Sequence, residues 1–246
     1  MMKPTPQIFA ADRKWFHMFA KSNDQTEIMI YDYIGWGGVT AQDFVSELQK
    51  IQTQKITVSI NTPGGDVFDG LAIYNALKAH GAEITTRVDG LAASIGSIIA
   101  LAGSRVLMAE ASFMMIHNPW GFAMGGAQDM REMADTLDKV GGVLRAIYMS
   151  KSGKASAEMQ AMMDAETWMT AQEAEDAKMA DEVLVKADEQ KSAQASRSFD
   201  LMAYRNVPKN LAAREASNDV DMTEVQQKAA QMRRRLALVE RGGRSR

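Results

Sequence analysis

The fold is decided by residues 56–103, which read ITVSINTPGGDVFDGLAIYNALKAHGAEITTRVDGLAASIGSIIALAG. Segments 56–62 and 83–90 are rich in β-branched residues, and each is followed by a segment of helical character. The first helix is expected to end at Gly81, and the second to begin near Ser94. Strands that alternate with helices predict βαβ units and therefore an α/β fold with a mainly parallel sheet.

The same alternation continues on both sides of this stretch. Upstream, residues 27–35 predict a strand, and Thr40 with Asp43 resembles the capping box of a following helix. Downstream, two short strands are expected within 105–119, before a long helix at about 126–150. Five apolar residues recur at helical spacing in that helix, and we expect them to form a packing surface rather than a metal–sulfur site: Met130, Met133, Leu137, Val140 and Leu144.

The pattern divides the chain into three parts. Residues 1–26 show little periodicity and are expected to form an N-terminal segment. The layered α/β domain is expected at 27–185, where the last strand-like run, DEVLV, ends. Residues 186–246 are polar at first and then contain a possible basic amphipathic helix at 223–240, so they predict a tail that is partly helical or disordered.

Composition excludes several classes of protein. The 246 residues are 46% hydrophobic and 24% charged, which is typical of a soluble globular chain. No apolar run is long enough to span a bilayer, and the N-terminus lacks the pattern of a secretory signal, so we expect a cytoplasmic protein. The absence of cysteine excludes disulfides, thiolate metal sites and a cysteine nucleophile.

The net charge of −3 hides an asymmetry between body and tail. Residues 186–246 contain 13 Lys and Arg against 8 Asp and Glu, whereas the rest of the chain is acidic. A basic tail on an acidic body is typical of a segment that contacts nucleic acid or an acidic partner. A solvated helix without a specific partner explains the same charge pattern equally well.

Three histidines restrict the search for a general base. His80 precedes Gly81 at a predicted helix end, where a structural role suffices, and His17 lies in the unpatterned N-terminal segment. His117 follows the apolar run FMMI and precedes NPWG, where a buried strand reaches a turn. A histidine in that place is either a structural residue or a base that works with a nearby nucleophile.

Ser94 is the candidate nucleophile, because its small neighbours allow a sharp turn from a strand into a helix. Backbone N–H groups at a helix N-terminus can stabilise an oxyanion. Ser94 could equally be a helix cap, since the sequence is not a G-x-S-x-G elbow. The loop PGGD at 63–66 can turn its N–H groups outward, and it matches neither phosphate-binding glycine pattern.

Four segments together resemble the Clp proteolytic-subunit family of serine peptidases. They are INTPGGDVFDGLAIYNAL, VDGLAASIGSIIALAG, FMMIHNPWG and ETWMTAQEA with MADEV, and they cover roughly 27–185. The resemblance implies the layered βαβ fold that Clp proteases share with crotonases. It also implies a homo-oligomeric ring and a protein substrate, without a metal or cofactor. No motif indicates an ATPase partner.

The resemblance assigns roles to individual residues. Ser94 corresponds to the nucleophile and His117 to the general base. Gly64 and Ile95 correspond to the donors of the oxyanion hole, with Gly65 as an alternative donor. The family's third residue is an aspartate, but this chain has Glu166 in that position, and Asp164 two residues earlier is the alternative.

Further hypotheses concern the natural substrate and the class of reaction. The variants NPWG and DAETWMTAQEA resemble the phage-encoded branch of the family, which implies trimming of capsid or scaffold proteins during head maturation. A crotonase-like acyl-CoA enzyme is an alternative that would use backbone donors without a Ser–His pair. A non-catalytic shell or scaffold component is a third alternative.

Overall fold

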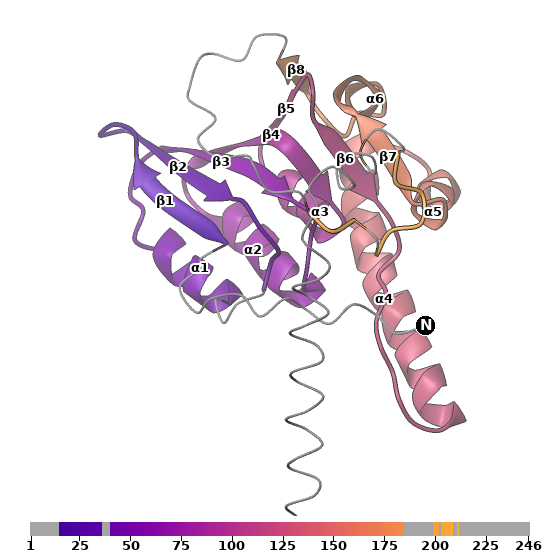
Figure 1. The fold of residues 1–246 in the computed structure, drawn as a ribbon. Coiled ribbons are helices and arrows are strands. Elements are labelled where there is room, and N and C mark those ends of the chain that lie inside the picture. Colours follow the sequence, from indigo (N-terminus) through magenta and orange to yellow (C-terminus); the bar gives the residue numbers. More distant parts are fainter. Residues whose placement is uncertain (1–14, 36–39, 185–198, 202, 209–210, 212–246) are drawn as a thin grey trace, which may run out of the picture. The chain divides into compact units, whose positions relative to one another are not determined.

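The computed structural model describes residues 15–35, 40–184, 199–201, 203–208 and 211. The chain divides into two compact units, Met1–Asn206 and Val207–Arg246. All the elements named below belong to the first unit, shown in Figure 1. The basic helix predicted at 223–240 and most of the predicted linker lie outside the described residues.

The first unit is built on an eight-stranded sheet in which the strand order is β1-β2-β3-β4-β5-β8. β6 pairs with β4 and with β7, away from this path. Only the β1–β2 and β6–β7 pairs are antiparallel, so the prediction of an α/β fold with a mainly parallel sheet is confirmed. The strands are β1 Phe16–Ala20, β2 Gln25–Ile30, β3 Lys55–Thr62, β4 Glu83–Ala93, β5 Arg105–Ala109, β6 Phe113–Ile116, β7 Thr167–Thr170 and β8 Glu182–Leu184.

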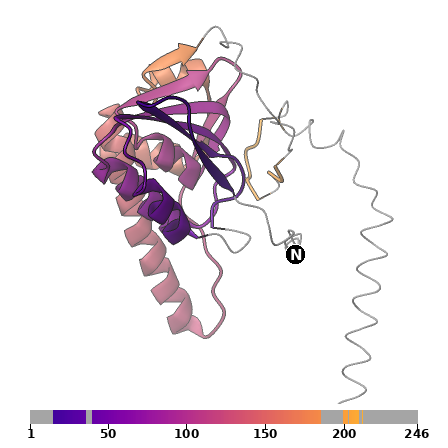
Figure 2. The same cartoon turned by 90° about the vertical axis from the view of Figure 1, so that its left-hand side faces the viewer.

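Within the described residues, six helices accompany the strands, and α1 and α2 lie together on one side of the sheet (Figure 2). A capping box at Thr40 with Asp43 begins α1, as the sequence predicted, and a second one at Thr170 with Glu173 begins α6. The helices are α1 Ala41–Leu48, α2 Val67–Ala79, α3 Ile95–Ala100, α4 Ala127–Ser152, α5 Ser156–Asp164 and α6 Ala171–Asp176. None of the helices within the described ranges is both long and apolar enough to cross a membrane.

The alternation of residues in the strands divides the sheet into two different faces. On one face of β2, β3 and β4 the alternate residues are buried and mostly apolar, and these apolar side chains share a core with Phe44 and Leu48 of α1 and with Ile73 and Leu77 of α2. The intervening residues make the other face polar. Helices pack on the first face of the sheet because that face is the apolar one.

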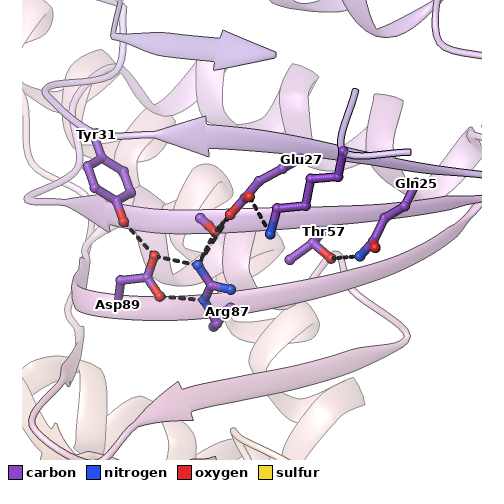
Figure 3. Close-up of polar contacts among 8 residues, drawn as sticks. Gln25, Glu27, Tyr31, Thr57, Arg87 and Asp89 are labelled. Atoms are coloured by element: carbon purple, nitrogen blue, oxygen red, sulfur yellow. Dashed lines mark hydrogen bonds and ion pairs between the residues drawn. The ribbon is translucent and has the colours of Figure 1, made fainter. Parts of the chain in front are cut away.

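A network of charges crosses the polar face between β2, β3 and β4 (Figure 3). The Arg87 guanidinium donates to Asp89 at 2.5 Å and to Ser59 at 2.8 Å, and it lies 3.3 Å from the Glu27 carboxylate. The Tyr31 hydroxyl donates to Asp89 at 2.5 Å. Burial alone would raise the pKa of Glu27, but hydrogen bonds from Lys21 and Ser59 and the nearby cationic charges lower it overall. Glu27 is therefore a paired carboxylate rather than an isolated buried charge.

Two regions differ from the sequence-based expectation. The N-terminal segment is not unpatterned throughout, because β1 pairs with β2 and buries Phe16 next to Trp15 in the core. The stripe along α4 is buried only toward its C-terminal end, where Leu144 is 4% exposed, whereas Met130 is 41% exposed. The N-terminal half of α4 extends beyond the sheet (Figure 1), so this chain alone does not cover that part of the stripe.

Candidate active site

The register of the sheet brings Ser94 and His117 together. The last residues of β4 pair in parallel with β6, so that Ala93 lies opposite Met115. Ser94 follows directly, and its N–H donates to the Met115 carbonyl at 2.9 Å. His117 is the first residue after β6. Two neighbouring strands therefore end with the candidate nucleophile and the candidate base at the same edge of the sheet.

Ser94 occupies a strained turn between β4 and α3. Its backbone has φ 54° and ψ −127°, a conformation that non-glycine residues rarely adopt outside functional sites. Its side chain makes no capping hydrogen bond to α3. Instead, Ser94 Oγ lies 2.7 Å from His117 Nε2. The geometry therefore favours a nucleophile–base pair over the helix-cap alternative.

The other serine and histidine candidates have structural partners. Ser97 Oγ donates to the Ser94 carbonyl at 2.6 Å and lies 2.7 Å from the Tyr148 hydroxyl. His80 follows α2, and its Nδ1 accepts the N–H of Ala82 at 3.1 Å. His17 lies on the edge strand β1. Ser94 and His117 therefore remain the candidate catalytic pair.

Burial of His117 sets its protonation. Only 9% of the residue is exposed, and this desolvation lowers the pKa of the imidazole. The Glu166 carboxylate acts in the opposite direction, and the Arg205 cation adds to the lowering. The imidazole is therefore neutral at neutral pH, which is the state that can accept a proton from Ser94.

The glycine loop between β3 and α2 approaches Ser94 closely. A Cβ atom on Gly64 would lie 2.8 Å from the Ser94 Cβ. The Gly64 N–H donates to Thr62 Oγ1 at 3.1 Å, whereas the Gly65 N–H has no hydrogen bond within the described part of the chain. Ile95 begins α3, so its N–H lacks a partner within the helix. Of the alternatives that the sequence left open, Gly65 with Ile95 fits an oxyanion hole better than Gly64.

Neither candidate carboxylate forms a hydrogen bond with His117 among the residues that the structure describes. Asp164 accepts hydrogen bonds from Asn118 and Gln160, both at 2.7 Å, and lies at the surface. Glu166 is only 4% exposed and has a left-handed backbone with φ 51°. Its charge opposes the larger lowering of the His117 pKa by burial, although its oxygens accept from other donors.

A segment that the sequence analysis assigned to the tail also reaches the site. Residues 199–206 belong to the first unit, and Tyr204 packs edge-on against His117 with ring centroids 5.4 Å apart. The aromatic residues Phe199 and Tyr204 within a polar stretch were the available signal, since such residues indicate contact with a folded surface.

The described ranges contain no group of three His, Cys, Asp or Glu side chains that could hold a metal ion. The site brings together a hydroxyl, an imidazole, backbone donors and a nearby carboxylate. This combination is the one used for acyl transfer by serine hydrolases.

A serine at a sharp strand-to-helix turn, paired with a histidine on an α/β sheet, defines a serine-hydrolase type of site. The family model described as Clp protease matches residues 10–187, and the chain belongs to this family. The predicted family is thus confirmed.

Similar proteins agree with this family. The ATP-dependent Clp protease proteolytic subunit 1 of Protochlamydia amoebophila is 36% identical over 169 residues, which cover 65% of this chain and 81% of that protein. The proteolytic subunit of Bacteroides fragilis is 38% identical over 53% of this chain, a match that spans 64% of that relative's length. A ClpP1 point mutant from Listeria monocytogenes has the same fold, with a TM-score of 0.58, 23% identity and coverage of 65% of this chain and 91% of its own.

Proposed function

We propose that this chain is a serine endopeptidase in which Ser94 is the nucleophile and His117 is the general base. The observation that carries the proposal is the 2.7 Å contact between Ser94 Oγ and His117 Nε2 at a strained turn where the serine caps nothing. The relatives named as proteolytic subunits support a peptide substrate.

The geometry supports acyl transfer in two stages. His117 takes the proton of Ser94 as Oγ attacks a peptide carbonyl. The N–H groups of Gly65 and Ile95 then stabilise the tetrahedral oxyanion, and His117 returns the proton to the leaving amine. Water, activated by the same imidazole, hydrolyses the acyl-enzyme. No step requires a metal or a nucleotide.

Glu166 is our candidate for the residue that positions His117. It is buried beside the imidazole, and its charge favours the imidazolium that forms during the reaction. Asp164 is the weaker candidate, because Asn118 and Gln160 already bind its carboxylate at the surface. A Ser–His dyad without a carboxylate remains the outcome if neither residue acts on His117.

For the natural substrate, we propose a capsid or scaffold protein trimmed during phage head maturation. The support is the sequence variants NPWG after His117 and DAETWMTAQEA around Glu166, while the relatives reported above are named as bacterial ATP-dependent Clp protease proteolytic subunits. A crotonase-like acyl-CoA enzyme is disfavoured, because its chemistry would not need the Ser94–His117 contact.

Labelling with a fluorophosphonate tests the proposal directly, because only an activated serine reacts. We expect modification at Ser94 in the wild type and none in Ser94→Ala, with peptide hydrolysis lowered by on the order of 10⁶ in kcat. Ser104→Ala is the matched control, since this exposed serine only donates to the Ile84 carbonyl. Equal hydrolysis by wild type and Ser94→Ala would disprove the assignment.

A further inference from the structure

Residues 199–201 and 203–206 belong to a short strap, and both ends of it are attached to the peptidase domain. In Figure 2 its orange trace lies beside the sheet, away from α1 and α2. At one end, the Phe199 ring packs edge-on against Tyr33 at 6.1 Å, and the Tyr33 hydroxyl donates to the Asp200 carbonyl at 3.1 Å. Leu201 is only 7% exposed. These contacts show that the strap is packed against the domain and does not merely pass it.

Tyr204 places its side chain in the candidate active site. Its ring packs edge-on against His117 and also against Trp168, with centroids 5.4 Å and 5.8 Å apart. Its hydroxyl donates to the carbonyl of Pro63, the residue directly before the two glycines of the loop. Burial raises the pKa of this phenol, and an interaction with the Ser94 side chain acts in the opposite direction. The neutral phenol thus lies among the nucleophile, the base and the glycine loop.

The backbone N–H groups after Tyr204 bind the carboxylate of Glu166. The N–H groups of Arg205 and Asn206 donate to the two oxygens of Glu166 at 3.0 Å and 2.7 Å. The Asn206 side chain also donates to the Ala165 carbonyl at 2.6 Å. Bonds from backbone N–H to a buried carboxylate are charge-assisted and therefore stronger than neutral ones.

We propose that the strap is an inhibitory segment that closes the active site until it is displaced. The proposal rests on the peptidase function proposed above. A substrate carbonyl has to reach Ser94 Oγ, and the Tyr204 side chain lies in that region. The same docking engages Glu166 with strap N–H groups, so it also holds the carboxylate that we assign to His117. Release of one segment therefore frees both the nucleophile and the positioning residue.

The size of the inhibition follows from the equilibrium between the docked and released strap. Only the released fraction reacts, so the apparent rate equals the rate of the released form multiplied by that fraction. Replacing Tyr204 by alanine removes both ring contacts and the hydroxyl bond, so docking depends on the backbone donors to Glu166 alone and is weakened. We expect Ser94 to be labelled at least about tenfold faster in Tyr204→Ala, a factor that corresponds to about 1.4 kcal/mol.

The test uses the full-length protein and two readouts. The first is the rate of fluorophosphonate labelling at Ser94 in wild type, Tyr204→Ala and the matched strap variant Ala203→Ser, which changes an exposed residue. The second is hydrogen exchange at the Arg205 and Asn206 amides, which reports docking without any need for activity. We expect these amides to be protected in wild type and Ala203→Ser, and to exchange faster in Tyr204→Ala.

The possible outcomes distinguish failure of the strap proposal from failure of the peptidase proposal. Equally rapid labelling of wild type and Tyr204→Ala would overturn inhibition by the strap while leaving the peptidase proposal intact. Unprotected Arg205 and Asn206 amides in the wild type would overturn the docked strap itself. No labelling of any variant, although the amides of Tyr204→Ala exchange freely, would overturn the peptidase function and the inhibitory role with it.

Discussion

At the scale of single residues, the backbone of Ser94 decides the interpretation of this site. A serine that caps a helix accepts an N–H bond from the first turn with an extended backbone. Ser94 instead has φ 54°, makes no such bond and points its hydroxyl at His117. A conformation of this kind costs on the order of 1–3 kcal/mol and persists only where the surrounding structure imposes it. The pairing of β4 with β6 supplies that constraint.

The charge of Glu166 leads to a prediction about the pH dependence of the reaction. Hydrolysis requires neutral His117, and burial lowers the pKa of this residue. The acid limb of the pH–rate profile should therefore lie below the ordinary histidine pKa of about 6.5. Glu166→Gln removes a charge that favours the imidazolium, so it should move the acid limb to still lower pH. It should also reduce kcat, by up to about 10⁴ if Glu166 acts as triad aspartates do.

The control for this prediction is Asp164→Asn, which should change neither the acid limb nor kcat. Rates of peptide hydrolysis against pH, measured in a Tyr204→Ala background, keep docking of the strap out of the comparison. If Asp164→Asn alone moves the profile, the two carboxylates have been assigned the wrong way round. An unchanged profile in both variants would indicate a Ser–His dyad.

At the scale of elements, the loop between β3 and α2 depends on glycine at position 65. Gly65 has φ 151°, and a Cβ there would lie 2.1 Å from the Ile34 carbonyl oxygen. Two backbone bonds hold this contact, because Ile34 N donates to the Gly64 carbonyl and Asp66 N donates to the Ile34 carbonyl. The loop is therefore fixed against the segment after β2, and its free N–H is held in one place.

Gly65→Ala should therefore lower the free energy of unfolding by on the order of 3 kcal/mol, since strain and overpacking add. Gly142→Ala is the matched control, because a Cβ at this position of α4 meets no atom within 4 Å. It should raise stability by about 0.5–1 kcal/mol, the gain expected for alanine over glycine in a helix. Chemical denaturation measures both. Unchanged stability of Gly65→Ala would show that the loop does not pack on Ile34.

At the scale of the whole molecule, most of the exposed large apolar side chains come from one stretch of the chain, residues 120–143. Seven large hydrophobic residues of the described chain are exposed, and five of them lie on α4 or on the loop before it. They are Trp120, Phe122, Met124, Met130 and Val143. A cluster of this kind marks a surface that contacts another protein. We infer that copies of this chain meet through α4, in agreement with the ring that the family resemblance implies.

A charge placed in that surface should weaken the assembly. Met130→Glu is expected to lower the mass of the oligomer in analytical ultracentrifugation, because a carboxylate would be buried without a partner. Gln42→Glu is the control, since it adds the same charge at an exposed position of α1, outside this surface. An oligomer unaffected by Met130→Glu, or a monomeric wild type, would contradict the role of this surface.

The sequence by itself determined the alternation of strands and helices, the capping box at Thr40 and the candidates Ser94 and His117. These features follow from short-range patterns: side-chain alternation, caps within one turn, and small residues at a sharp bend. The same patterns missed β1, because pairing with β2 rather than local periodicity makes Phe16–Ala20 a strand.

Only the tertiary structure decided which groups meet at the site. The choice between Gly64 and Gly65 depends on which N–H the Thr62 hydroxyl accepts, and the partners of Glu166 come from a segment about 40 residues further along the chain. Tyr204 reaches the Pro63 carbonyl across 141 positions of sequence. Such contacts depend on packing between distant segments, which no local pattern encodes, so the candidate nucleophile was predictable and the strap that covers it was not.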